Sequence, residues 1–217
     1  REIIVSVAKN VNRHSLPSAD ETIGAQAELL SSQLQSMSEA LFPPTSQKVL
    51  RKFTSGEAAR LIGISDSTLR KMTLAGEGPQ PETTSNGRRL YNLSEINQIR
   101  RLLAQSTRGR ETIEFVPHRR PGEHLQVLAV TNFKGGSGKT TTTAHLAQFL
   151  ALQGYRVLAV DLDPQASLSA LLGVLPELDV ASNHTLYAAI RYDEERRALS
   201  EVIRPTYFDG LDLVPGN

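Results

Sequence analysis

The spacing of the hydrophobic residues near the start of the chain predicts one long amphipathic helix. Residues 1–20 are polar and weakly periodic, and we expect a flexible or partner-dependent start there. The apolar residues that follow recur at alternating steps of four and three, which is the a/d seam of nearly three heptads. They are Ile23, Ala27, Leu30, Leu34, Met37 and Leu41. Such a helix can dock on its own domain or pair with another chain. We favour a dimerisation helix over residues 21–42 that ends at Pro43.

Short capped segments predict a mainly helical helix-turn-helix module over residues 45–105. Residues 54–57 read Thr-Ser-Gly-Glu, a capping box that starts a short helix. After a turn of three residues Ser65 caps a second helix, an arrangement typical of a helix-turn-helix whose second helix enters the DNA major groove. The dipeptide Asn86-Gly87 then predicts a hairpin that can serve as a wing, and residues 92–95 start a further helix.

Residues 125–217 alternate between apolar runs and helical segments, which is the pattern of an α/β fold. We expect strands over 125–131, 156–161 and 211–214, with a helix over 140–153 between the first two. This order predicts a right-handed crossover in a parallel sheet. A sheet of three strands leaves an edge and a helix-facing surface uncovered, and the sequence does not begin with Met. We therefore expect the segment to be the N-terminal part of a larger domain, with its sheet truncated.

The loop between the first strand and the helix has the composition of a phosphate-binding P-loop. It comprises Lys134, Gly135, Gly136, Ser137, Gly138, Lys139, Thr140 and Thr141. The glycines let backbone N–H groups converge on phosphate oxygens, while Lys139 reaches the β- and γ-phosphates and the Thr140 hydroxyl contacts Mg²⁺. The alternative, a turn without a ligand, needs only one or two glycines and no pair of lysines. Phe133 replaces the first glycine of the strict pattern, and Lys134 is an additional lysine beside it.

Two carboxylates, Asp161 and Asp163, follow the second strand. In open α/β sheets ligands bind at the carboxyl ends of the strands, where the P-loop also lies. A carboxylate there can hold Mg²⁺ through water or orient the water that attacks the γ-phosphate. The alternative is a pair of surface carboxylates after a strand. Next to a P-loop, the pair predicts a nucleotide site that holds Mg²⁺.

Charge is unevenly distributed along the chain and indicates a polyanion partner for its middle segment. Residues 43–124 carry 14 Lys and Arg against 8 Asp and Glu, whereas both flanking segments are acidic. The excess predicts DNA contacts from the second helix and the wing, with a solvated basic face as the alternative. The candidate contacts are Ser67, Thr68, Arg70, Lys71, Arg88 and Arg89. Residues 106–124 contain four arginines and are expected to be a basic linker.

Composition excludes several other classes of site. The absence of cysteine excludes disulfides, iron–sulfur ligation and thiol catalysis within these residues. The five histidines show no metal-ligand spacing. No run approaches the ~20 apolar residues that a bilayer span requires. We therefore expect a cytoplasmic protein that does not contact a membrane.

The helix-turn-helix segment resembles the winged-helix DNA-binding domain of the MerR family. The similarity is carried by residues 53–59, Phe-Thr-Ser-Gly-Glu-Ala-Ala, by residues 87–91, Gly-Arg-Arg-Leu-Tyr, and by the order of helices and hairpin. It implies that the recognition helix and the wing both contact DNA. A helical scaffold that has lost DNA binding is the alternative.

The P-loop, together with Asp-Leu-Asp-Pro-Gln over residues 161–165, resembles the deviant Walker ATPases of the ParA/MinD superfamily. With a winged helix in front, the chain is most similar to plasmid partition ATPases, in particular the RepA group of rhizobial repABC replicons. The resemblance implies a P-loop NTPase fold, ATP or ADP and Mg²⁺ as cofactors, and a homodimer. It also implies that Lys134 crosses the dimer to the partner's nucleotide, that Asp163 positions the hydrolytic water and that Asp161 lies near the metal. Hydrolysis would thereby depend on dimer formation.

The function implied by this resemblance is plasmid segregation. We expect an ATPase that binds operator and non-specific DNA, works with a centromere-binding partition partner, represses its own operon and is associated with the nucleoid. The alternative is a nucleotide-gated transcriptional repressor without a segregation role. A membrane ATPase of the MinD type is a third, weaker alternative, since the winged helix argues against it. The family's Walker B strand and adenine contacts lie beyond residue 217, so we expect no ATP turnover by this segment alone.

Overall fold

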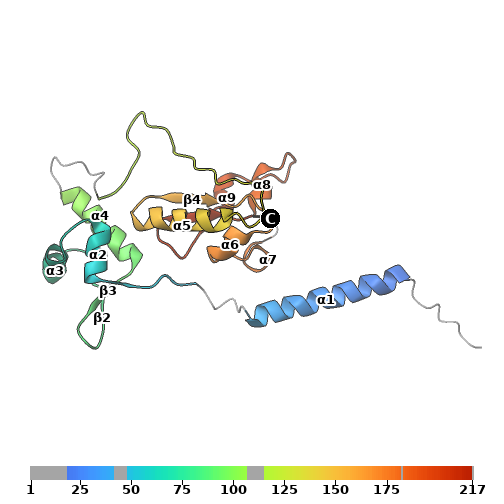
Figure 1. The fold of residues 1–217 in the computed structure, drawn as a ribbon, viewed down its shortest axis with the longest axis horizontal. Helices are drawn as coiled ribbons and strands as arrows, with labels where there is room; N and C mark the ends of the chain where they lie inside the picture. Colours follow the sequence, from blue (N-terminus) through green and yellow to red (C-terminus); the bar gives the residue numbers. More distant parts are fainter. Residues whose placement is uncertain (1–18, 42–47, 107–114, 182, 217) are drawn as a thin grey trace, which may run out of the picture. The chain divides into compact units, whose positions relative to one another are not determined.

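Helix α1 forms a compact unit of its own. The computed structural model describes residues 19–41, 48–106, 115–181 and 183–216, and the chain divides into units of residues 1–46 and 47–217 (Figure 1). In the first unit α1 spans Ala19–Leu41, which confirms the predicted helix. Its apolar seam is exposed, with Leu34 at 67%. No helix in the described ranges, α1 included, is long and apolar enough to cross a membrane. The predicted flexible start falls largely on residues 1–18, outside the described ranges, and dimerisation stays a prediction.

The second unit begins with a basic module, residues 48–106, built from a small sheet and three helices. Its elements are β1 Phe53–Thr54, α2 Ser55–Ile62, α3 Asp66–Leu74, β2 Glu82–Thr83, β3 Arg89–Tyr91 and α4 Leu93–Ser106. The strand order is β1-β3-β2, both pairs are antiparallel, and Phe53 lies opposite Tyr91. In the hairpin turn the Gly87 N–H donates to the Thr84 carbonyl at 2.9 Å. The predicted helix-turn-helix and wing are confirmed.

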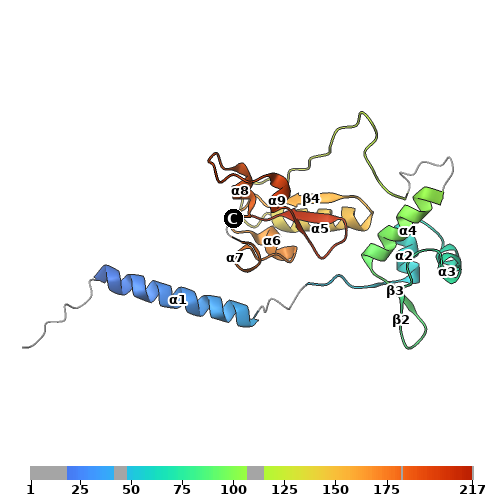
Figure 2. The same ribbon diagram turned by 180° about the vertical axis from the view of Figure 1, so that it is seen from behind.

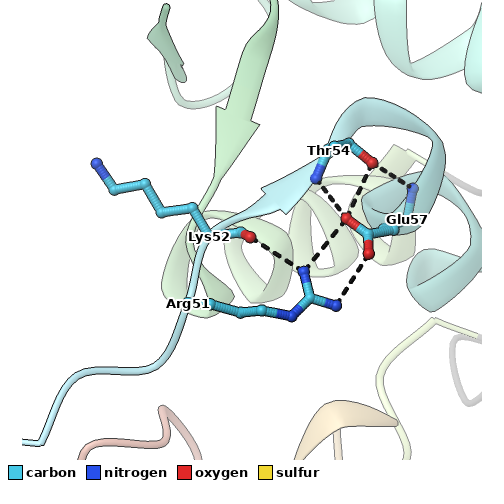
Figure 3. Close-up of polar contacts among 4 residues, drawn as sticks. All are labelled: Arg51, Lys52, Thr54 and Glu57. Atoms are coloured by element: carbon cyan, nitrogen blue, oxygen red, sulfur yellow. Dashed lines mark hydrogen bonds and ion pairs between the residues drawn. The ribbon is translucent and has the colours of Figure 1, made fainter.

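A capping box fixes the start of α2 (Figure 3). The Thr54 N–H donates to Glu57 Oε2 at 2.8 Å, and the Glu57 N–H donates to Thr54 Oγ1 at 3.4 Å, as the sequence predicted. Arg51 donates two hydrogen bonds to the same carboxylate, at 2.9 and 3.3 Å, and its guanidinium lies 4.6 Å from the centre of the Phe53 ring. The hydrogen bond from Arg51, followed by those from Thr54, lowers the pKa of Glu57 to about 2. The cap therefore ties the incoming chain to the first helix of the module.

The α/β part, residues 115–216, surrounds a second three-stranded sheet. Its elements are α5 Lys139–Leu152, β4 Val157–Val160, α6 Ser167–Leu171, α7 Pro176–Asp179, α8 Leu186–Ile190, α9 Leu199–Val202, β5 Arg204–Pro205 and β6 Leu211–Val214. The strand order is β4-β6-β5, with β4 and β6 parallel and β5 antiparallel to β6. Figure 2 shows β4 and β6 beside α5, which packs against both strands and against α6. The mixed α/β class is confirmed, whereas the short helices α6 to α9 were not predicted.

The predicted strand over residues 125–131 is wrong, because this segment forms no strand. Leu125, Val127 and Leu128 are exposed at 73%, 81% and 65%. A strand needs a neighbour that shares its backbone hydrogen bonds. In the described part of the chain β4 pairs only with β6. The apolar residues of 125–131 are typical of a strand, but no neighbouring strand pairs with them.

One hydrophobic core joins the basic module to the α/β part. The same cluster of buried side chains contains Leu69, Tyr91 and Ile96 from the first and Ala151 and Leu213 from the second. The chain between them passes through residues 107–114, which lie outside the described ranges. Shared burial of apolar surface stabilises the second unit as one folded body.

Candidate functional site

The glycine-rich loop before α5 has the backbone geometry of a phosphate cradle. Gly136 and Gly138 have φ angles of 69° and 82°, in the left-handed region that favours glycine. Gly138 is the N-cap of α5 and makes no side-chain cap. A Cβ added at Gly135 or Gly136 would meet no atom within 4 Å. The loop therefore presents an open backbone surface that an anion can approach closely.

The N–H groups of this loop are free for an anion. Within the described ranges, the N–H groups of residues 135–138 donate to no acceptor. The first N–H groups of α5 have no intrahelical partner by geometry. The Lys134 N–H donates to Asn132 Oδ1 at 2.9 Å, and the Lys134 side chain is exposed. Lys139 and Thr140 are half-buried, and Thr141 is exposed. Together with the helix dipole, this array of donors fits phosphate oxygens.

Asp161 and Asp163 occupy different environments after β4. Asp161 is 3% exposed, and its Oδ2 accepts hydrogen bonds from the Ser169 N–H at 2.9 Å and from Ser169 Oγ at 2.7 Å. Its Oδ1 accepts from the Asp163 N–H at 3.2 Å. Asp163 is exposed, and its Oδ1 accepts from the Gln165 N–H at 3.0 Å. The protein thus holds Asp161 in place, while the Asp163 carboxylate faces solvent.

The segment after β6 closes over Asp161, and sequence reasoning did not find this contact. The Gly216 N–H donates to Ser169 Oγ at 3.1 Å. A Cβ on Gly216 would lie 2.7 Å from the Asp163 carbonyl oxygen and 3.0 Å from Asp161 Cγ, so only glycine fits without a shift of the backbone. Ser169 and Gly216 are 47 residues apart, and such a contact leaves no local pattern.

The residues present fit a Mg²⁺ ion that is held mainly by phosphate and water. The described residues contain no group of three or more His, Asp or Glu side chains that could hold a metal ion. Mg²⁺ at nucleotide sites usually takes one or two protein oxygens and completes its shell with phosphates and waters. Thr140 and Asp161 are the predicted protein ligands, and Asp161 forms no ion pair with another described residue. A bound nucleotide would bring the remaining oxygens.

The predicted DNA contacts on α3 are all exposed, but they differ in how they are held. They are Ser67, Thr68, Arg70 and Lys71. The hydroxyls of Ser67 and Thr68 each lie 2.8 Å from Ser65 Oγ, so they take part in the N-cap. Arg70 pairs with Asp66 at 2.9 Å, one turn earlier. Lys71 forms no ion pair within the described ranges and is the α3 cation most available to a phosphate.

The two wing arginines differ in their exposure and in their backbone contacts. Arg88 is exposed, and its N–H donates to Thr84 Oγ1 at 3.1 Å, which fixes the turn without engaging its guanidinium. Arg89 is half-buried and lies opposite Thr83 in the β2–β3 ladder. Of the two predicted wing contacts, Arg88 is therefore the more exposed.

Two protein-family models match this chain, one in each part of the second unit. Residues 128–213 match the CobQ/CobB/MinD/ParA nucleotide binding domain. Residues 54–91 match the MerR family regulatory proteins. The first match contains the glycine-rich loop and both carboxylates, and the second contains the helix-turn-helix and the wing.

Similar proteins are named for replication and partition. A putative replication protein A of Sinorhizobium fredii is 54% identical, over 91% of this chain and 48% of the relative. Protein SopA of Escherichia coli K12 is 36% identical, over 79% of this chain and 42% of the relative. A solved partition protein shares the fold, with a TM-score of 0.51 and 19% identity over 93% of this chain and 54% of that one. The chain spans about half the length of the curated relatives it matches.

Proposed function

Because residues 128–213 belong to the CobQ/CobB/MinD/ParA nucleotide-binding domains and residues 54–91 are MerR-like, we propose that the chain is the DNA-binding and phosphate-binding part of a plasmid partition ATPase. The observation that carries this proposal is the open array of N–H donors at the start of α5, in the same folded unit as a winged helix. The replication name of one relative and the partition name of a solved protein with this fold support the proposal.

The P-loop residues would bind and process the nucleotide. Residues 135–141 hold the phosphates through backbone N–H groups, Lys139 neutralises the β- and γ-phosphates, and Thr140 provides a hydroxyl to Mg²⁺. Asp161, which Ser169 holds in place, would help to hold Mg²⁺ beside the phosphates. Asp163 is exposed and free to orient an attacking water. Lys134 is exposed at the front of the loop, a position from which it can serve the nucleotide of a second subunit.

DNA binding and dimerisation complete the proposed cycle. Lys71 and Arg88 contact phosphates beside and within the major groove, with Ser67, Thr68, Arg70 and Arg89 in supporting positions. The exposed seam of α1 pairs with a second copy. ATP binding favours the dimer, a centromere-binding partner stimulates hydrolysis, and operator binding represses the operon. The proposed DNA-binding domain, linker and ATPase-domain segment are residues 45–105, 106–124 and 125–217.

The test is fluorescence anisotropy with the protein's own promoter region and with random DNA, each titrated without nucleotide, with ADP and with a non-hydrolysable ATP analogue. Each titration is repeated at several salt concentrations, because phosphate contacts release counterions. Operator binding with ADP and broad binding to random DNA with the analogue support a partition ATPase. Operator binding without analogue-dependent affinity for random DNA would exclude the partition function. The protein would then be a nucleotide-gated repressor.

A further inference from the structure

Two cations of the basic module lie at the C-terminal ends of two helices of the α/β part. Arg100, on α4, donates from Nη2 to the carbonyl of Leu152, the last residue of α5, at 2.7 Å. Lys48 donates from Nζ to the carbonyls of Ala170 and Leu171, which end α6, at 2.7 and 3.1 Å. Each of these helices therefore ends on a positive charge that comes from the other part of the unit.

These contacts have a clear physical basis. The last carbonyls of a helix have no intrahelical donor and carry the negative end of the helix dipole, so a cation there is stabilising. Arg100 is 2% exposed and bonds to no carboxylate among the described residues. Its other acceptors are Asn97 Oδ1 at 2.6 Å and the carbonyl of Leu61, near the end of α2, at 2.5 Å. One guanidinium thus joins the end of a helix in the helix-turn-helix to the end of α5.

The surrounding residues make room for Arg100 and support it. Burial lowers the pKa of Arg100 to about 10, so the guanidinium stays charged at neutral pH. Gly154 has a φ of 92°, and a Cβ there would lie 3.1 Å from Arg100 Nη1. Asn97 in turn donates to Asp209 Oδ2 at 2.8 Å, in the segment before β6. The contact is therefore built from several elements rather than from a chance surface approach.

The same two helices also contact the candidate nucleotide site, α5 through its N-terminus and the five-residue α6 through its central Ser169. Helix α5 begins at Lys139, directly after the glycine-rich loop. Helix α6 begins at Ser167, and its Ser169 holds Asp161. Helix α5 thus spans from the nucleotide site to Arg100, and the short α6 contacts both Asp161 and Lys48. A rigid helix transmits a shift at one end to contacts at the other.

We propose that Arg100 and Lys48 are positioning residues that couple the nucleotide site to the DNA-binding module. The proposal rests on the proposed function. Nucleotide bound at the start of α5 shifts the positions of α5 and α6. Because Arg100 and Lys48 are hydrogen-bonded to the ends of these helices, the shift also changes the position of the helix-turn-helix. Because coupling between two sites is reciprocal, DNA should change nucleotide affinity by the same factor. A merely structural role would lower stability and leave this factor unchanged.

The experiment measures the coupling factor in the full-length protein. A fluorescent duplex of its own promoter region is titrated with and without saturating ADP, and a fluorescent ADP analogue is titrated with and without that duplex. The variants are Arg100→Gln and Lys48→Met, with Arg101→Gln as matched control on an exposed face of α4. Lys48 is exposed, so its variant keeps the test open if Arg100→Gln does not fold.

We expect both variants to bind DNA alone and nucleotide alone within about threefold of wild type, while the coupling factor falls toward one. Arg101→Gln should keep the wild-type factor. Wild-type coupling in Arg100→Gln and in Lys48→Met overturns the inference and leaves the proposed function intact. A wild-type protein whose DNA binding does not respond to nucleotide overturns the proposed function as well.

Discussion

The hydroxyl groups of Thr73 and Tyr91 lie 2.9 Å apart in the interior of the basic module. Thr73, in the last turn of α3, donates to the carbonyl of Leu69, so its oxygen accepts the proton of Tyr91. Tyr91 ends β3 and is fully buried. This bond joins α3 to β3, a strand of the β2–β3 hairpin.

We predict that Tyr91→Phe lowers the free energy of unfolding by about 1 kcal/mol, because one buried hydrogen bond is lost and Thr73 keeps its bond to Leu69. Tyr91→Ala should cost about 3–5 kcal/mol through the cavity it leaves. Urea denaturation measures both. Tyr192→Phe is the control, since Tyr192 is fully exposed. Equal stability of Tyr91→Phe and wild type would show that the bond contributes nothing.

Ser169→Ala should destabilise the protein by about 1–3 kcal/mol, because the buried Asp161 carboxylate loses a hydroxyl donor and Gly216 loses its acceptor. Thermal or chemical denaturation measures the loss. Ser167→Ala is the matched control, because Ser167 is the exposed first residue of α6. If the two variants are equally stable, the Asp161–Ser169 contact is not holding the carboxylate.

The cap at Glu57 predicts a loss of stability in acid. Its pKa in the folded protein is about 2, below the ordinary 4.5, so the unfolded chain binds this proton first as the pH falls. The contribution is fully present above about pH 4.5 and is lost as the pH falls toward 2. Arg51→Gln removes the main cause of the shift and should make the acid slope of unfolding shallower. Arg60→Gln, elsewhere on α2, should leave the slope as in wild type.

Lys71→Ala and Arg88→Ala should each weaken binding to specific and random DNA alike, and reduce the slope of log affinity against log salt by about 1. Arg156→Ala, an exposed arginine of the α/β part, controls for net charge. The same loss with Arg156→Ala would mean that binding follows overall charge rather than these two side chains.

Leu34→Asp should shift the protein from dimer to monomer in sedimentation experiments, because it places a charge in the centre of the α1 seam. Leu34 is 67% exposed within the chain, so the fold itself does not depend on it. Ser32→Asp introduces the same charge on the opposite face of α1 and should leave the dimer unchanged. A dimer that survives Leu34→Asp places the interface elsewhere.

Local chemistry made most of the basic module predictable. The capping boxes, the helix periods and the Asn86-Gly87 turn act within a few residues, so α2, α3, α4 and the hairpin followed from the sequence. The prediction of a strand over residues 125–131 was wrong because a strand needs a hydrogen-bonding partner, and the sequence of the strand itself does not specify that partner. The buried contact of Arg100 was not predicted for a related reason. Its hydrogen bond to the Leu152 carbonyl joins residues 52 positions apart, and an arginine on a helix is usually expected at the surface.

Titration of a fluorescent ADP analogue into wild type, Lys139→Ala and Lys134→Ala shows whether the loop over residues 134–141 binds nucleotide phosphates. Lys139 lies at the start of α5, and removal of a charged hydrogen-bond donor there should weaken binding about 10–100-fold. Lys134→Ala should bind the ADP analogue with wild-type affinity, because Lys134 is proposed to contact the γ-phosphate of the nucleotide bound by a second subunit. Equal affinity of wild type and Lys139→Ala, or no binding by either, would mean that this loop is not a nucleotide-phosphate site.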